Sequence, residues 1–277
     1  MQRQEGTFRT GDGRTLFRQA WIPEARGRAV VLLVHGFNEH SGRHVWHAER
    51  LADRRCAVHA FDLRGHGRSE GPRAYVDRFE RYIDDFDKFY QIVRLESPGV
   101  PMFVFGHSMG GTIAALWAID RQRDVAGLIL SAPLVSVPTH VFPVLRRFAG
   151  FASRWFPRLR LVRLGCRNLS RDQAVVDRFR RDPLVFHGRF PVRTGAEILR
   201  AGQTVLGQAS ALRPPLMILQ GTADRVVAPE GAEELAKRAG SADKTLRRYD
   251  GLFHELLSEP EREQVLRHLA DWLDTHC

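Results

Sequence analysis

Lysine, cysteine and long apolar runs are scarce in this chain of 277 residues. The three cysteines, Cys56, Cys166 and Cys277, are far apart and show no C-x-x-C spacing, which argues against a disulfide framework or a zinc site. The longest apolar runs, such as residues 29–34, are far too short to cross a bilayer. Residues 1–13 lack the apolar stretch of a secretory signal, so we expect a cytoplasmic protein.

The positive charge is carried almost entirely by arginine, because lysine occurs only at positions 88, 237 and 244. The formal net charge at pH 7 is +10. A genome rich in G and C would produce this bias without any function, whereas a binding role would require an anionic partner. No nucleic-acid module is visible, so we expect no nucleic-acid partner and keep an anionic membrane as the alternative.

Short apolar runs alternate with helical patterns along most of the chain. The apolar runs lie at residues 29–35, 57–62, 101–107, 125–132, 215–221 and 245–251. The helical patterns lie at residues 78–95, 111–120, 229–239 and 262–273. This alternation predicts an α/β protein with a mostly parallel sheet that helices cover on both faces.

Two segments depart from the alternation. The first twenty residues show strand-like patterns around Gly11-Asp12-Gly13, which predicts an N-terminal β-hairpin. Residues 135–191 contain no run that continues the strand series, and they accumulate arginine, aromatic residues and proline. We interpret residues 1–134 and 192–277 as the core of one domain. Residues 135–191 are then a mainly helical cap, inserted after the sixth strand.

Two segments match the pattern G-x-S-x-G of a nucleophilic serine on a sharp turn, GHSMG at 106–110 and GRSEG at 67–71. Such a nucleophile elbow needs an apolar strand before the serine, a helix after it, and glycines on both sides, where larger side chains would collide. Ser108 has both flanking elements, whereas Ser69 lies among glycines and a proline that are typical of a loop. We therefore predict Ser108 as the nucleophile of an α/β-hydrolase fold.

A serine hydroxyl needs a base that removes its proton, and the base needs an acid that orients it. In this fold the three groups follow in the order serine, acid, histidine. Asp224 comes just after a predicted strand, and His254 lies in a loop beyond the last one. Asp250 and Glu255 are close to His254 in the sequence but are expected at the wrong end of the strand. The predicted triad is therefore Ser108, Asp224 and His254.

The oxyanion hole of this fold uses two backbone N–H groups, one after the nucleophile and one after an early strand. His35-Gly36-Phe37 follows the apolar run 29–34 at the corresponding place. We therefore predict the N–H groups of Phe37 and Met109 as the two donors.

Histidines 35, 40, 44 and 47 are close enough in the sequence to suggest a metal site. Their spacing matches none of the usual signatures, and His35 begins a different element. We expect neither a metal nor an organic cofactor.

Several motifs together resemble the monoacylglycerol lipase branch of the α/β-hydrolases, which also contains lysophospholipases. They are HGFNEHSGRH, FDLRGHGRSEGPRAY, GHSMGG, SAPL, the D-P-L of Asp182-Pro183-Leu184, and GLFHELLSEPERE. The resemblance runs from about residue 6 to the end of the chain. It implies the same triad, and a head-group pocket formed by Glu39, Arg43 and His107. His44 stands where this family usually has tyrosine.

The chain is thus expected to be a serine hydrolase that cleaves the ester bond of single-chain lipids. The resemblance implies monoacylglycerol as the substrate, with glycerol and a free fatty acid as products. A lysophospholipase or a general carboxylesterase with the same triad is the nearer alternative. A non-catalytic α/β-hydrolase binding protein is more remote, because such proteins usually lack part of the triad. Head group, acyl length, regiospecificity and oligomeric state stay open.

The cap contains a segment, residues 143–156, that has an amphipathic pattern at helical spacing. Its aromatic and aliphatic residues share one face, and Arg146, Arg147 and Arg154 fall on the opposite side. This pattern is typical of a helix at a membrane surface, but also of a helix that packs on its own domain. Peripheral membrane contact through the cap is therefore a hypothesis.

Overall fold

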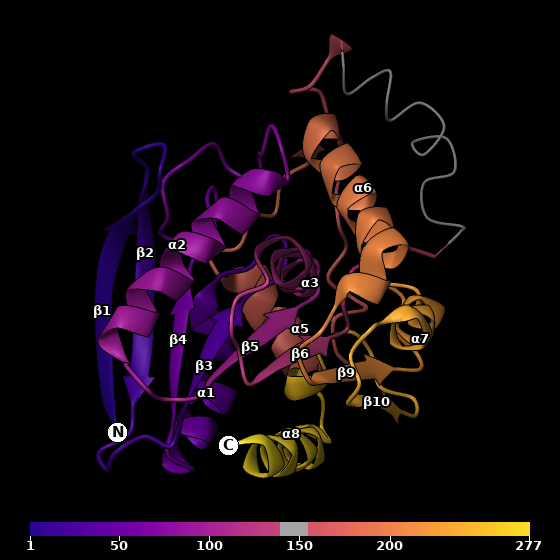
Figure 1. The fold of residues 1–277 in the computed structure, drawn as a ribbon. Coiled ribbons are helices and arrows are strands. Elements are labelled where there is room, and N and C mark those ends of the chain that lie inside the picture. Colours follow the sequence, from indigo (N-terminus) through magenta and orange to yellow (C-terminus); the bar gives the residue numbers. More distant parts are fainter. Residues whose placement is uncertain (139–154) are drawn as a thin grey trace.

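An eight-stranded sheet forms the centre of the protein (Figure 1). The computed structural model describes residues 1–138 and 155–277. From one edge to the other, the strands are β1 (Gln2–Arg9), β2 (Thr15–Ile22), β4 (Cys56–Phe61), β3 (Ala29–Val34), β5 (Met102–His107), β6 (Gly127–Ser131), β9 (Leu216–Gly221) and β10 (Lys244–Tyr249). β2 pairs antiparallel with β1 and β4, and all other neighbours run parallel. The predicted hairpin and mostly parallel sheet are confirmed.

Helices cover both faces of this sheet (Figure 1). One face is covered by α1 (Val45–Asp53) and α8 (Arg262–His276). The other is covered by α2 (Glu80–Glu96), α3 (Met109–Arg121), α6 (Val192–Gln208) and α7 (Pro229–Arg238). Helices α2, α3, α7 and α8 occupy the four helical patterns of the sequence, whereas α1 and α6 were not predicted.

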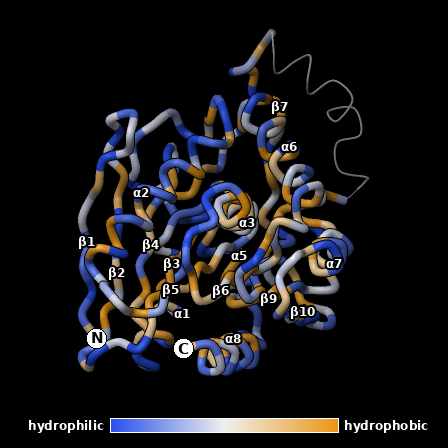
Figure 2. Tube along the Cα trace, viewed as in Figure 1, coloured by the Kyte–Doolittle hydropathy of each residue, from blue (hydrophilic) through white to orange (hydrophobic). Residues whose placement is uncertain are grey.

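The strands in the middle of the sheet are apolar at almost every position because both of their faces are buried (Figure 2). Successive side chains of a strand point to opposite faces. In β3, Val30, Leu32 and Val34 accordingly pack on the side of α2 and α3, and Val31 and Leu33 pack on the side of α1 and α8. All five side chains are buried, which fixes the register of the strand.

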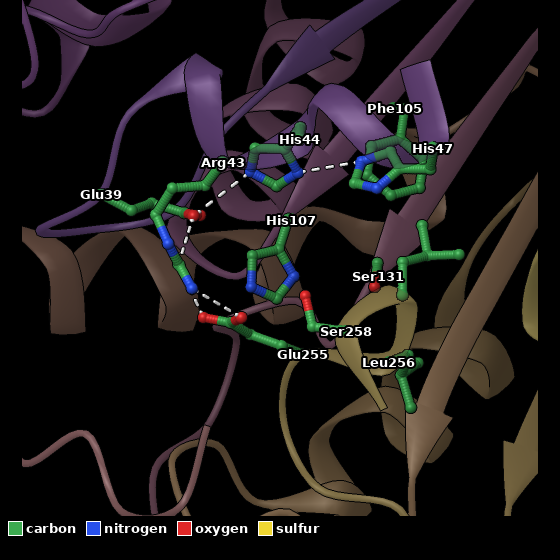
Figure 3. A pocket seen from close by; sticks show the side chains of 11 residues that line it. Glu39, Arg43, His44, His47, Phe105, His107, Ser131, Glu255, Leu256 and Ser258 are labelled. Carbon is green, nitrogen blue, oxygen red and sulfur yellow. Dashed lines mark hydrogen bonds and ion pairs between the residues drawn. The ribbon is translucent and has the colours of Figure 1, made fainter. Parts of the chain in front are cut away.

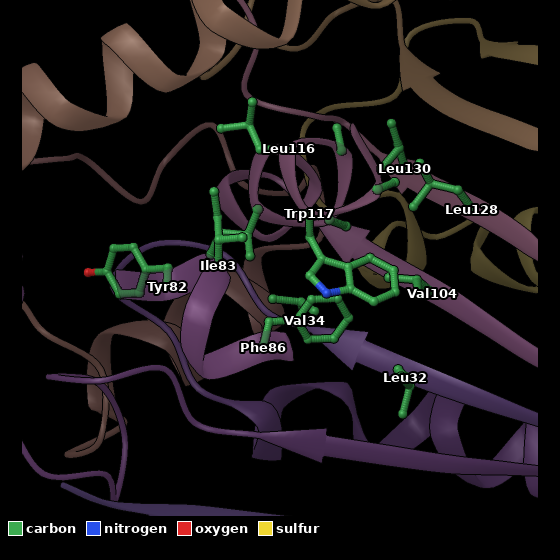
Figure 4. Close-up of a cluster of buried hydrophobic side chains, with 14 of the residues drawn as sticks. Leu32, Val34, Tyr82, Ile83, Phe86, Val104, Leu116, Trp117, Leu128 and Leu130 are labelled. Carbon is green, nitrogen blue, oxygen red and sulfur yellow. The ribbon is translucent and has the colours of Figure 1, made fainter. Parts of the chain in front are cut away.

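The larger of the two hydrophobic clusters is built around the indole of Trp117 from α3 (Figure 4). The ring of Phe86 from α2 meets this indole edge to face, with centroids 4.9 Å apart. The indole N–H donates to Asp87 at 3.0 Å, so the buried tryptophan leaves no unpaired donor. This packing anchors α3, the helix that begins immediately after Ser108.

The cap predicted at residues 135–191 is described in part. It contains β7 (Arg160–Val162), α5 (Gln173–Arg181) and β8 (Phe190–Pro191), and β7 pairs antiparallel with β8 as a separate two-stranded sheet. The predicted amphipathic helix lies, up to residue 154, outside the described residues. The boundaries of the cap stay a prediction. In the described part of the chain, no helix is long and apolar enough to span a membrane.

The parallel strands β3, β5, β6 and β9 all end at one edge of the sheet. Loops that follow such strands collect the functional groups of α/β proteins. Three of these loops carry predicted site residues, which are Phe37 after β3, Ser108 after β5 and Asp224 after β9.

Candidate active site

Ser108 lies on a sharp turn between β5 and α3, with a φ of 54° and a ψ of −120°. A positive φ is unfavourable for any residue with a side chain, and such strain is concentrated at functional sites. The glycines around it are required by close packing. A Cβ atom on Gly106 would lie 2.4 Å from the carbonyl oxygen of Gly110, and one on Gly110 would lie 2.1 Å from that of Val34. This is the strained strand–turn–helix geometry that an elbow requires.

The imidazole of His254 links the hydroxyl of Ser108 to the carboxylate of Asp224. Its Nε2 lies 2.9 Å from the Oγ of Ser108, and its Nδ1 lies 2.7 Å from the Oδ2 of Asp224. All three residues are buried. Because a carboxylate only accepts, Nδ1 must carry the proton, which leaves Nε2 of the neutral ring free to accept the hydroxyl proton. The structure thus brings the three predicted triad residues together.

The competing residues are engaged elsewhere. The hydroxyl of Ser69 donates to the carbonyl of Asp62 and accepts from the N–H of Phe17, so it holds the loop after β4 against β2. Asp250 accepts a hydrogen bond from Thr222 at the surface. Within the described chain, neither side chain hydrogen-bonds to His254, whose ring nitrogens bond to Asp224 and Ser108.

Burial and charge act in opposite directions on the triad. Burial alone would lower the pKa of His254, but the Asp224 carboxylate beside it raises the pKa above its usual value. Burial alone would raise the pKa of Asp224, but His254 and the N–H groups of Val226 and Val227 hold it below its usual value. Asp224 is therefore ionised, and His254 is a stronger base than a free imidazole.

Phe37 lines the same cavity as Ser108, and Met109 follows Ser108 directly in the chain. Met109 is the first residue of α3, where a backbone N–H has no partner within the helix. Phe37 follows Gly36, whose own N–H donates to the Oε1 of Glu39 at 2.6 Å. The next residue, Asn38, has a φ of 66°, which turns the loop sharply.

Arg43 joins the loop after β3 to the loop that carries His254 (Figure 3). Its guanidinium donates to Glu39 at 2.9 Å and to both carboxylate oxygens of Glu255 at 2.7 and 2.9 Å. Burial alone would raise the pKa of both carboxyls, but His44 and Arg43 hold the pKa of Glu39, and Arg43 that of Glu255, below the usual value. Glu255, which the sequence did not predict as a site residue, is thus part of the same buried network.

His107 and His44 extend this network behind the triad. The ring centroid of His107 lies 4.9 Å from that of His254 and 6.0 Å from that of His44. Burial lowers the pKa of His107 to about 4, so its ring is neutral. The Nε2 of His44 lies 3.3 Å from Glu39, and its Nδ1 lies 3.0 Å from the Nε2 of His47 (Figure 3).

A family model described as serine aminopeptidase, S33, matches residues 25–261, which is most of the chain. The chain belongs to this hydrolase family. A monoacylglycerol lipase of Mycolicibacterium smegmatis is 34% identical over 274 residues, covering 99% of this chain and 98% of the relative. The human monoglyceride lipase is 37% identical over 267 residues, covering 95% of this chain and 88% of the relative.

The solved structures agree with this assignment. The crystal structure of Paleococcus ferrophilus monoacylglycerol lipase has a TM-score of 0.85 and 31% identity, covering 95% of this chain and 99% of that chain. The α/β-hydrolase fold and the resemblance to the monoacylglycerol lipase branch are both confirmed.

In this S33 family member, the four clustered histidines are divided among three different contacts. His35 donates to the carbonyl of Gly36 and accepts from a backbone N–H, His40 pairs with Asp182 at 2.9 Å, and His44 pairs with His47. Across residues 1–138 and 155–277, no group of three or more His, Cys, Asp or Glu side chains could hold a metal ion.

Two cavities meet at the site of the S33 hydrolase. The larger has a volume of about 1,050 Å³ and is lined by Ser108 and His254. Its apolar lining includes Phe37, Leu134, Phe179, Phe186, Phe190 and Ile198. The smaller, about 20 Å³, has room for a single water molecule and lies within the network of Figure 3. Glu39, Arg43, His107 and Glu255 line both cavities, so they form the boundary between them.

Proposed function

We propose that the protein is a carboxylic ester hydrolase that cleaves monoacylglycerols into glycerol and free fatty acids. The observation that carries the proposal is the hydrogen-bonded chain from Ser108 through His254 to Asp224 beside a large apolar cavity. The full-length similarity to monoacylglycerol lipases supports this substrate over other esters. A volume of about 1,050 Å³ accommodates a single acyl chain, since small-molecule sites measure about 300–1,000 Å³.

The reaction proceeds through an acyl-enzyme. The Oγ of Ser108 attacks the ester carbonyl while its proton passes to the Nε2 of His254. His254 then gives this proton to the glycerol oxygen as the ester C–O bond breaks. A water molecule attacks the acyl-enzyme, its proton again passes to His254, and the fatty acid leaves as Ser108 recovers its hydrogen. Asp224 stabilises the transient imidazolium in both halves.

The tetrahedral intermediates carry a negative oxygen that needs preorganised donors. The N–H groups of Phe37 and Met109 are the proposed donors, because both belong to the turns that flank Ser108. Each such donor contributes a factor of about 10²–10³ in rate.

Glu39, Arg43 and His107 are proposed to receive the glycerol hydroxyls. They line the larger cavity together with Ser108 and His254. Arg43 is shared between the ionised carboxylates of Glu39 and Glu255, so this wall carries a net negative charge and suits an uncharged polyol better than a phosphodiester.

A substrate panel tests the proposal. We expect the largest kcat/KM on a monoacylglycerol, with smaller values on lysophosphatidylcholine and on soluble short esters. A preference for lysophosphatidylcholine would make the protein a lysophospholipase, and a preference for short esters would make it a general carboxylesterase. No turnover of any ester, with no labelling by a fluorophosphonate, would leave only a binding protein.

The cap is proposed to contact the membrane that holds the substrate. Seven large apolar residues of the described chain are exposed, and five of them lie in the cap between residues 155 and 164. They are Trp155, Phe156, Leu159, Leu161 and Leu164. Arginines at positions 158, 160, 163 and 167 are interspersed with them. Apolar side chains that insert among lipids beside cationic ones suit an anionic bilayer surface.

Vesicle co-sedimentation tests the membrane contact. We expect binding to vesicles that contain phosphatidylglycerol, weaker binding to pure phosphatidylcholine, and loss of the electrostatic part at high salt. Replacing Trp155 and Phe156 together by alanine should reduce binding, whereas replacing Leu95, an even more exposed apolar residue on α2, by alanine should not. Equal binding by all three proteins would remove the cap from the contact.

A further inference from the structure

Gln220 is a buried polar residue in a strand that is otherwise apolar. It is 1% exposed and is the last residue but one of β9. Leu216 and Ile218, four and two residues earlier, belong to the large apolar cluster on one face of the sheet. Strand alternation places the side chain of Gln220 on this same face, where an aliphatic side chain would be expected. A buried amide at such a position needs hydrogen-bond partners for its polar atoms.

The side-chain nitrogen of Gln220 faces the triad acid. Its Nε2 donates to the Oδ2 of Asp224 at 3.2 Å and to the carbonyl of Gly221 at 3.1 Å. Its Oε1 is buried and has no hydrogen-bond partner within the described chain. In the opposite orientation of the amide, Oε1 would face two other acceptors, so the carboxylate of Asp224 fixes which way the amide points. In the observed orientation Oε1 has no donor, and Nε2 donates to Asp224.

This donation completes the set of groups that hold Asp224. The Oδ1 of Asp224 accepts the backbone N–H groups of Val226 at 2.7 Å and Val227 at 3.1 Å. The Oδ2 accepts Nδ1 of His254 at 2.7 Å and the amide of Gln220. Gln220 is therefore the one side chain besides His254 that, in the described chain, donates to the oxygen facing the base.

We propose that Gln220 is a positioning residue of the triad, whose amide orients the Oδ2 of Asp224 toward His254 and takes up part of its negative charge. The proposal rests on the proposed function, because it assumes that His254 is the base that activates Ser108. It assigns Gln220 no contact with the substrate.

The charge on Oδ2 sets how readily His254 takes up a proton. Besides Asp224, the charged or titratable groups that face His254 are Glu255, Glu39 and His107. The two glutamates share one arginine and His107 is neutral, whereas Asp224 bonds directly to the ring of His254, so the charge on Asp224 acts most strongly on the imidazole. Without the amide, more negative charge remains on Oδ2, and the pKa of His254 rises. Since His254 must be neutral to accept the Ser108 proton, activity is then lost at a higher pH.

The test is the pH dependence of Ser108 labelling by a fluorophosphonate in the full chain, with Gln220→Met as the main variant and Gln220→Leu as a second of the same kind. The midpoint of the acid limb does not depend on how much enzyme is folded. We expect the midpoint to rise by about half a pH unit in both variants. The matched control is Gln19→Met, which removes another buried amide whose partners are Ser41 and Arg3, and which should leave the midpoint unchanged.

A second measurement asks whether Gln220 acts through Asp224. In an Asp224→Asn background, adding Gln220→Met should change the labelling rate less than twofold, because the charge that Gln220 shares is gone. An unchanged midpoint in both Gln220 variants, or a rate loss that is as large in the Asp224→Asn background as in the wild type, would overturn the proposal. Labelling needs no lipid, so a wild type that labels but does not cleave monoacylglycerol refutes only the substrate. A wild type that does not label refutes the triad itself.

Discussion

Replacing Arg43 by methionine tests the buried network that joins the loop of His254 to the loop of Phe37. The side chain of Arg43 is 11% exposed, and those of Glu39 and Glu255 are 4% and 8% exposed. Methionine keeps much of the apolar volume of the arginine stem but leaves two carboxylates without their counter-ion. Removing one partner of a buried ion pair costs about 3–5 kcal/mol. Because Arg43 is slightly exposed, we expect a loss of about 3 kcal/mol.

The pH dependence of this loss has a definite sign. In the wild type the pKa values of Glu39 and Glu255 are below normal, so their contribution to stability is present above the unfolded-state pKa and is lost as the pH falls through the lowered values. In the variant, loss of the guanidinium raises both pKa values relative to the wild type, and protonation relieves the unpaired charges as the pH falls. The difference in stability between the two proteins should therefore be largest near pH 8 and smaller near pH 5.

Urea unfolding followed by tryptophan fluorescence at both pH values measures this difference. The matched control is Arg50→Met, because Arg50 pairs with Asp53 at the surface, where the two side chains are 53% and 57% exposed. Such pairs contribute about 0–1 kcal/mol. An Arg43→Met protein as stable as the Arg50→Met control at pH 8, or one that is destabilised equally at both pH values, would refute the reasoning.

Two further substitutions test the proposed head-group residue Glu39 and the nucleophile elbow around Ser108. Glu39→Ala should lower kcat/KM on monoacylglycerol more than on a p-nitrophenyl ester, because losing a partner of a substrate hydroxyl costs about 1–3 kcal/mol. Equal losses on both substrates would instead indicate a structural role for Glu39, which accepts a hydrogen bond from the N–H of Gly36. Gly110→Ala should give little folded protein, since the new Cβ atom would lie 2.1 Å from a backbone oxygen of β3. A Gly110→Ala protein with wild-type melting temperature and activity would contradict the elbow geometry.

The strands of the sheet could be predicted because burial on both faces requires a nearly continuous run of apolar residues. Each apolar run became a strand within a few residues of its predicted bounds. Helix α6 could not be predicted from a local pattern, because its segment contains Gly195, Gly202 and Gly207, which weaken helix propensity. Its stability comes from packing instead. A Cβ on Gly202 would lie 2.8 Å from the carbonyl of Leu134, so the helix can approach the core only with glycine there.

The triad and the oxyanion donors could be selected because the elbow, the chain order and the loops after strands each restrict the choice, whereas Glu39, Arg43 and His107 came from the family resemblance. Glu255 could not be selected, because its role depends on Arg43, 212 residues earlier in the chain. No local pattern encodes a contact of that separation. Gln220 did leave a signal, since it is a polar residue at a position where the strand pattern calls for an apolar one. That signal becomes meaningful only when the position of Asp224 is known.

The most direct test of the account compares two serine variants. Ser108→Ala should abolish monoacylglycerol hydrolysis and fluorophosphonate labelling, because it removes the hydroxyl that lies 2.9 Å from His254. Ser69→Ala, which matches it in burial and in its own G-x-S-x-G pattern, should keep both activities. A Ser108→Ala protein that still labels and still hydrolyses monoacylglycerol, or an inactive but folded Ser69→Ala protein, would contradict the account.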